Sequence, residues 1–467
     1  MRRRFVGSIF VFCVVAAWVV SCTPKRTSAT REERLKWNSN TLTNDYQQFG
    51  HKNDKWNADA VEALTEFARI HGASDDEQLV LTDMAGDAAQ SAVSEGCDDP
   101  MVQYMAVRYG STTHAKPIGE RREAYHVAAS NLQSSAYSPL RKFYANLEAA
   151  ELNYIPRDDK SWPMVRQLRL DAVADLNSAY QDKTIPEAEA YEAAEAVFNM
   201  LQHNQRELTN AYNQVSATLS TSGAKPAVGA LVKAEFYLQY AWIARGHAAA
   251  DKVTEEGWRL FGERLGVAEK ALDEAWSLDP YDEQIPTLMI SICLGQQKPR
   301  AEMEKWFDRA MKLDPNNYRA ARAKLHFLLP EWYGSREDML EFGHQCVAAT
   351  NWGGHVPLIL VDAHSQFYDS LPADDRRGYW TLPDVWPDIK AGYERFAQTE
   401  PDATKFRYPY AGYAVRCGQW ADFQDQIRII QENDRKLNVN YFGGAEAFSN
   451  LVELASSHTA AAGGTAK

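Results

Sequence analysis

Residues Ala268–Pro280 read AEKALDEAWSLDP, and the same pattern returns 35 residues later as Met303–Pro315, MEKWFDRAMKLDP. Apolar residues recur in both copies at three- and four-residue steps, which is typical of one face of a helix. Ala275 and Ala310 hold equivalent positions, where a small side chain lets the backbone of a neighbouring helix approach. Each copy ends in proline, which cannot continue a helix. The pattern therefore predicts a repeated unit of closely packed helices.

Neighbouring segments complete further helical pairs. Glu283–Leu294 has the apolar content of a helix that packs before the second copy. Tyr318–Leu329 and Ser335–Ala349 predict another pair, in which Ser335 and Asp338 have the spacing of a capping box. Near the end of the chain, the spacing of apolar residues between Tyr410 and Ile427 predicts one more.

This spacing resembles the tetratricopeptide repeat (TPR), whose period is about 34 residues. The resemblance covers about 235–432, and Trp306–Cys346 also resembles a TPR-containing bacterial domain family of unknown function. One hairpin cannot bury its apolar face alone, so such units must stack. The resemblance thus implies an α-solenoid of TPR-like hairpins, and arrays of that kind commonly bind peptides or partner proteins on their concave face.

The remainder of the chain is also predicted to be helical, so the expected fold class is all-α. Runs with helical spacing include Ala60–Ile70, Val165–Tyr180 and Ala190–Leu201, whereas alternating strand patterns are scarce. Ser, Thr, Gly and Pro cluster in 216–229 without apolar spacing, which indicates a domain boundary or a long loop.

We therefore predict an irregular helical region at 51–215, a TPR-like repeat domain at 230–455 and a disordered tail at 456–467.

The N-terminus has the order of a secretory signal. Arg2, Arg3 and Arg4 precede an apolar run, Phe5–Val20, and Ser21 then stands before Cys22. A Cys after a small residue at this point resembles the lipobox of bacterial lipoproteins, in which the signal is removed and the new N-terminal Cys is acylated.

That resemblance implies a signal peptide at 1–21, lipid attachment at Cys22 and a tether at 22–50. The chain would then be held in the membrane by acyl chains, since several chains anchor firmly where one does not. Thr23 after the Cys resembles a signal for the outer membrane of the bacterial cell envelope, with the body facing the periplasm or the cell surface. The alternatives are an ordinary signal peptide cut elsewhere and an uncleaved anchor.

The composition of the chain excludes some classes of binding partner. Hydrophobic residues make up 45% and charged residues 24%, as in a globular protein, and the formal net charge is -13. Because nucleic acid binding needs basic patches, we predict no nucleic acid partner. Cys97, Cys293, Cys346 and Cys417 show no metal or redox spacing, and either buried thiols or disulfides are compatible with the sequence.

Motifs that would indicate catalysis are missing. The sequence has no phosphate loop, no dinucleotide fingerprint, no zinc-protease helix and no nucleophile elbow. We therefore predict no enzyme activity, no cofactor and no catalytic residue. Carboxylates such as Glu331, Asp338 and Glu341 could form a glycan-cleaving pair only by converging in space.

The densest group of metal-ligating residue types is His344, Cys346, His355, Asp362 and His364. Residues two apart point to opposite sides of a helix, so His344 with Cys346, and Asp362 with His364, should not converge. We predict no metal site.

Three aromatic residues, Trp332, Tyr333 and Trp352, lie outside the helical spacing. They could contact a partner, because aromatic residues dominate contact energies, or they could pack against the ends of the helical pairs. We favour packing.

Together these features predict a lipid-anchored, non-catalytic envelope protein that binds partner proteins or peptides through a TPR-like scaffold. The alternatives are an envelope enzyme acting on glycan or peptidoglycan, with the repeats as a substrate arm, and a glycan-binding lipoprotein.

Overall fold

The computed structural model describes residues 29–70, 75–155, 161–182, 185–246, 250–401, 406–433, 437 and 439–464. Within these ranges the chain forms twenty-one α-helices and four short 3-10 helices, and no strand. The predicted all-α fold class is confirmed.

The helices of the first half are α1 (Ala29–Phe49), α2 (Asn57–Ile70), α3 (Asp75–Ser94), α4 (Pro100–Tyr109), α5 (Ser111–His114), α6 (Ile118–Gln133), α7 (Pro139–Asn153), α8 (Trp162–Ala179), α9 (Glu187–Leu201), α10 (Gln205–Ser222) and α11 (Pro226–Arg245). Those of the second half are α12 (Glu255–Leu278), α13 (Gln284–Gly295), α14 (Arg300–Leu313), α15 (Tyr318–Phe327), α16 (Arg336–Ala348), α17 (Ile359–Ser370), α18 (Val385–Thr399), α19 (Arg407–Arg416), α20 (Trp420–Asn433) and α21 (Ala445–Gly464). The 3-10 helices are η1 (Ala250–Lys252), η2 (Val356–Leu358), η3 (Tyr379–Thr381) and η4 (Val439–Phe442).

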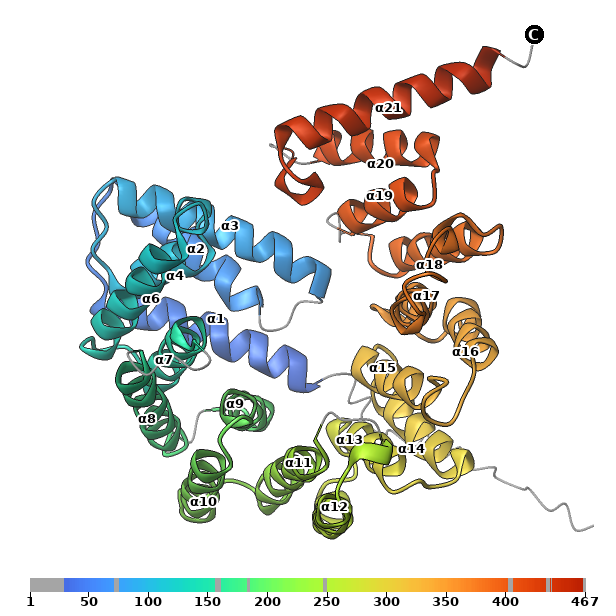
Figure 1. Ribbon diagram of the computed structural model, residues 1–467. Helices are drawn as coiled ribbons and strands as arrows, with labels where there is room; N and C mark the ends of the chain where they lie inside the picture. Colours follow the sequence, from blue (N-terminus) through green and yellow to red (C-terminus); the bar gives the residue numbers. More distant parts are fainter. Residues whose placement is uncertain are drawn as a thin grey trace, which may run out of the picture.

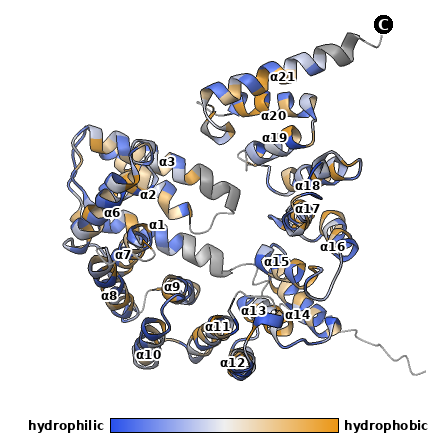
Figure 2. Ribbon diagram, in the orientation of Figure 1, coloured by the Kyte–Doolittle hydropathy of each residue, from blue (hydrophilic) through white to orange (hydrophobic). Residues whose placement is uncertain are grey.

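The helices follow one another round an open arc, and α1 runs into its hollow (Figure 1). Helices adjacent in sequence pack together, as α11 does on α12, α13 on α14 and α19 on α20. Apolar and polar residues alternate along the helices, as expected when each buries only one face (Figure 2).

The buried apolar residues form four successive clusters along the chain. They extend over 42–292, 290–363, 358–417 and 408–455. Successive clusters overlap in sequence because a helix at each boundary contributes residues to both, as α13 does to the first and second clusters and α19 to the third and fourth.

The two copies of the repeated pattern lie in α12 and α14. Ala275 and Ala310 are fully buried, as expected for the positions of closest helix approach. Ser335 caps α16 by accepting a hydrogen bond from the backbone N–H of Asp338, which is one of the two bonds of the predicted capping box, and its hydroxyl donates to Oδ2 of Asp338.

The structure differs from the predicted boundary at 216–229. α10 continues to Ser222, and α11 begins only a few residues later at Pro226. The hydroxyls of Ser220 and Thr221 donate to carbonyls one turn earlier, so these residues are accommodated inside a helix. Gly223, with φ +84°, ends α10. The core cluster of 42–292 crosses this region without interruption.

Two other segments are more ordered than predicted. Helix α1 occupies most of the predicted tether at 22–50, and it buries Leu42 and Tyr46 in the first core cluster. Helix α21 extends into the predicted disordered tail, where the ring of His458 stacks on Trp420 with 5.2 Å between centroids. The alanine-rich composition favours helix there, because alanine has the highest helix propensity.

The four cysteines of the body are free and buried. Burial raises the pKa of the Cys293 thiol to about 12 and that of Cys417 to about 11. The structure therefore has buried thiols where the sequence left disulfides open.

Candidate binding groove between α15 and α17

Helices α15 and α17 lie nearer the hollow of the arc than α14 and α16 do (Figure 1). On α15, the buried face is made by Ala320, Ala321 and Leu325. Since residues four apart share a helix face, the polar residues Arg322 and His326 lie together on another side of α15.

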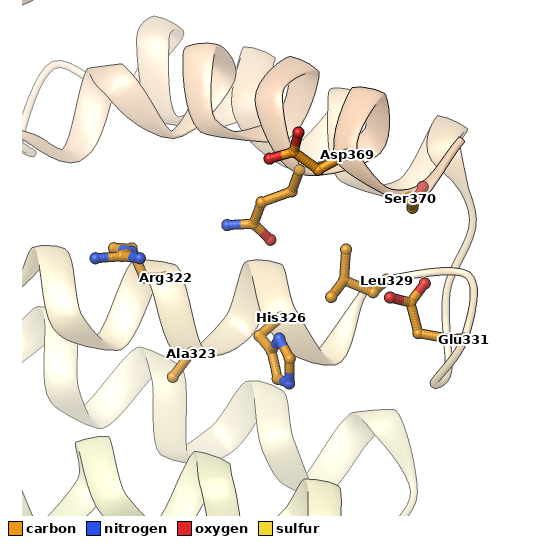
Figure 3. A pocket seen from close by; sticks show the side chains of 8 residues that line it. Arg322, Ala323, His326, Leu329, Glu331, Asp369 and Ser370 are labelled. Atoms are coloured by element: carbon orange, nitrogen blue, oxygen red, sulfur yellow. The ribbon is translucent and has the colours of Figure 1, made fainter. Parts of the chain in front are cut away.

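A groove of about 630 Å³ separates these two helices (Figure 3). It is lined by Arg322, Ala323, His326, Leu329, Glu331, Gln366, Asp369 and Ser370. Polar side chains from both helices therefore face one space that is large enough for a few residues of a ligand.

Arg322 supplies a positive charge at one end of the groove (Figure 3). Its guanidinium carbon lies 5.7 Å from the ring centroid of Tyr318. The hydroxyl of Tyr318 donates to Oδ2 of Asp362 at 2.5 Å, which joins α15 to α17 beside the groove. Among the described residues, no carboxylate forms an ion pair with Arg322. This cation is exposed and available to a ligand.

Negative charge lies toward the other end. Figure 3 places Glu331 and Ser370 far from Arg322, with Asp369 above the middle of the groove. Glu331 and Asp369 are both exposed. The groove is therefore polarised along its length, because its cation and its carboxylates are not paired with each other.

The side chains of Gln366 and His326 line the middle of the groove. Oε1 of Gln366 is covered and has no hydrogen-bond partner among the described residues, which leaves a strong acceptor unsatisfied. His326 packs against Trp332, with 6.0 Å between ring centroids, and burial lowers the pKa of its imidazole. His326 is consequently neutral at pH 7 and adds no charge to the groove.

Another residue of α15 reaches across the hollow. Nη2 of Arg319 lies 2.7 Å from Oε1 of Glu195, and Nη1 lies 3.5 Å from Oε1 of Glu192, both on α9. Arg322 is one turn further along α15, on nearly the same side. The groove therefore opens toward the hollow of the arc rather than toward its outer surface.

The predicted partner-contact aromatics lie in different surroundings. Trp332 packs edge-on against Trp242, 5.9 Å between centroids, and beside Arg245. Trp352 packs in the same way on Phe307, at 5.6 Å. Both are partly buried against the second core cluster.

Tyr333 is the more accessible of the three, with 38% of its surface exposed. Its hydroxyl donates to the carbonyl of Leu294 at 3.3 Å. Only Trp332 adjoins the groove, through His326.

The group of metal-ligating residue types is only partly brought together. His364 is fully buried, and its Nε2 lies 3.1 Å from Oδ2 of Asp388. Nε2 of His344 lies 3.3 Å from the same oxygen. Cys346 is buried in the second core cluster, and the ring of His355 packs on Phe396.

His364 is further held by Tyr379, whose hydroxyl lies 2.9 Å from its Nδ1. This network joins α16, α17, η3 and α18. In the parts of the chain that the structure describes, no group of three or more His, Cys, Asp or Glu could hold a metal ion.

The three carboxylates singled out in the sequence do not gather. Glu331 lines the groove, whereas Asp338 pairs with Arg300 at 2.6 Å and Glu341 accepts from Gln345 on the same helix at 3.5 Å.

Cys22 and the predicted signal peptide lie outside the described residues. No helix of the described ranges is long and apolar enough to cross a membrane.

Sequence reasoning overlooked Arg322, His326, Gln366 and Asp369. A polar stripe could have indicated the α15 side of the groove, because Arg322 and His326 are four residues apart in a segment that was predicted to be helical. No comparable pattern marks Gln366 as their neighbour.

The fold and the groove define an all-helical protein with a polarised polar groove on the inner side of an arc. No family model, no curated protein and no solved structure matches the chain.

Proposed function

We propose that this chain is a lipid-anchored envelope protein that binds a polypeptide partner in the groove between α15 and α17, without catalysing a reaction. Two groups of that groove carry the proposal: the exposed cation of Arg322, which has no ion pair with a described carboxylate, and the covered amide oxygen of Gln366, which has no hydrogen-bond partner among the described residues. A peptide offers carboxylates to the first and backbone N–H groups to the second.

The proposal includes a TPR-like α-solenoid as the scaffold. The repeated pattern in α12 and α14, the buried Ala275 and Ala310, and the succession of overlapping cores support it. In such a stack each helical pair contacts mainly its neighbours, and the inner helices together present an extended surface.

The anchor is supported by the order of charges, apolar residues and Cys22 in the sequence. Acyl chains on Cys22 would place the body at a membrane surface, where its acidic charge discourages broad contact with anionic lipid.

Groove binding can be tested by selecting a random peptide library on the purified chain that lacks residues 1–21. Arg322→Ala should weaken the selected peptides about three- to fivefold, since a charge pair made by an exposed side chain is worth up to about 1 kcal/mol. Arg428→Ala is the matched control, because Arg428 is an exposed arginine of α20. If no peptide is selected, or if both variants bind alike, the groove is not the binding site.

The anchor is tested separately by mass spectrometry of the mature N-terminus after expression in a bacterium. A diacyl or triacyl mass on Cys22, lost in Cys22→Ser, is expected. An unmodified N-terminus would refute the anchor and leave the groove proposal intact.

A further inference from the structure

We infer that the groove selects an extended segment carrying one acidic and one basic side chain about three residues apart, with the acidic side chain at Arg322 and the basic one at Glu331 and Asp369. This inference rests on the proposed peptide-binding function and names its ligand class.

The acidic end of the ligand is assigned by Arg322. Its guanidinium has no ion pair with any described carboxylate, and its Cζ lies 5.7 Å from the centroid of the Tyr318 ring. The planar fork of an arginine suits a carboxylate, which can accept two parallel hydrogen bonds. A positively charged ligand group at this end would meet repulsion.

The basic end is assigned by two carboxylates. Glu331 follows α15, and Asp369 belongs to the last turn of α17, so they approach the groove from opposite walls. A lysine or arginine side chain at the end far from Arg322 would meet Glu331, and the charge of Asp369, which Figure 3 places above the middle of the groove, would add to the attraction. An acidic ligand group placed there would be repelled twice.

The spacing follows from helix geometry. Arg322 lies five residues before the end of α15 at Phe327, which is roughly 7.5 Å along the helix axis at about 1.5 Å per residue, and Glu331 follows the helix, so the two charges are on the order of 10 Å apart along the groove. An extended peptide covers that distance in about three residues, at roughly 3.3–3.6 Å each. The two charged side chains of the ligand should therefore be separated by about two residues.

The centre of the groove suits small side chains and a backbone contact. Ala323 and Leu329 supply apolar wall, and Gln366 offers an amide whose oxygen lacks a partner. A backbone N–H of the ligand would satisfy that oxygen after a side-chain rotation. His326 is neutral at pH 7 because burial lowers its pKa, so it adds no positive charge between Arg322 and the carboxylates.

The test uses four capped peptides, in which Glu-Ala-Ala-Lys, Lys-Ala-Ala-Glu, Glu-Ala-Ala-Glu or Lys-Ala-Ala-Lys is placed in a neutral Gly/Ser segment. Binding to the chain without residues 1–21 is measured by fluorescence anisotropy at low salt. One of the two mixed-charge peptides should bind at least about tenfold more tightly than either like-charged peptide, and the order of the better one gives the direction of the chain.

Charge reversal at each end makes the test specific. Arg322→Glu leaves acidic groups at both ends, so the variant should prefer Lys-Ala-Ala-Lys. The double variant Glu331→Lys, Asp369→Lys should prefer Glu-Ala-Ala-Glu. Arg428→Glu adds the same charge change as the first variant at an exposed site of α20, and should keep the wild-type preference.

Unchanged preferences in both charge-reversed variants would overturn the inference. If Arg322→Ala weakens library-selected peptides but charge order has no effect, the groove binds peptides and only the ligand class is wrong. If no peptide of either set binds, the proposed function fails as well.

Discussion

Nη2 of Arg319 in α15 lies 2.7 Å from Oε1 of Glu195 in α9, although 124 residues separate them in the chain. The pair crosses the hollow of the arc and joins its two halves beside the groove. Its energetic contribution is small, because 51% of the Arg319 side chain is exposed. Its position nevertheless allows it to influence how far the arc is open.

Arg319→Met should open the arc with little loss of stability. We expect the free energy of unfolding to fall by less than about 1 kcal/mol, as for other exposed pairs. The radius of gyration from small-angle X-ray scattering should increase, and high salt should produce a similar increase in the wild type. Arg428→Met removes an exposed pair within α20 and should leave the scattering unchanged. An unaltered radius for Arg319→Met would show that the pair does not hold the halves together.

Gly343 of α16 lies close to the backbone of α17. A Cβ at this position would lie 2.8 Å from Cα of Leu360, a backbone atom that cannot easily move. Gly343→Ala should therefore lower the free energy of unfolding by about 1–3 kcal/mol, measured by urea denaturation. Gly266→Ala in α12 is the control, since its Cβ would meet nothing within 4 Å. That variant should be stabilised by up to about 1 kcal/mol. Equal effects of the two substitutions would contradict this packing.

Asp99 links the start of α4 by hydrogen bonds to Tyr137, which lies just before α7. Its Oδ1 accepts from the backbone N–H groups of Met101 and Val102, and its Oδ2 accepts from the hydroxyl of Tyr137 at 2.9 Å. Asp99→Ala should cost about 2–4 kcal/mol, because it removes a cap and leaves a buried hydroxyl unsatisfied. Asp98→Ala changes an exposed neighbour and should cost less than about 0.5 kcal/mol in the same denaturation series. A small effect at Asp99 would mean that water replaces these bonds.

Asp282 should make stability depend on pH. Burial, assisted by Glu283, raises the pKa of its carboxyl to about 7, whereas the unfolded chain has an ordinary value near 3.8. Between about pH 4 and pH 7 the folded state keeps a proton that the unfolded state has lost, so this group contributes less stability as pH rises. Asp282→Asn preserves an acceptor for the N–H of Gln284 and removes the charge.

The variant should match the wild type near pH 4 and exceed it at pH 8 by on the order of 1–3 kcal/mol. Urea denaturation at both pH values measures the difference. Asp308→Asn, at an exposed site of α14, should show no such trend. If the difference in free energy of unfolding between Asp282→Asn and the wild type is the same at both pH values, the carboxyl of Asp282 has an ordinary pKa in the folded chain.

Helical segments could be predicted because their cause is local. Apolar residues at three- and four-residue steps placed α2, α8 and α9, and the repeated pattern placed α14. Composition was a poorer guide. The Ser/Thr-rich end of α10 and the alanine-rich end of α21 have compositions typical of loops or tails, yet they are helical. Side-chain hydroxyls can bond to the preceding turn, and alanine favours helix.

The groove could not be predicted in the same way. Arg322 and Gln366 are 44 residues apart, and nothing in either local pattern indicates that they line one space. Helix geometry predicted that His344 would not converge with Cys346, nor Asp362 with His364, but it could not predict that His344 and His364 both contact Asp388, which belongs to a third helix. Side chains on one helix follow its period, so the chain alone establishes which residues share a face. The tertiary structure decides which of these faces meet and which charges are left without a partner. The reason is that a polar group finds a hydrogen-bond or ion-pair partner only if the helix that packs against it supplies one.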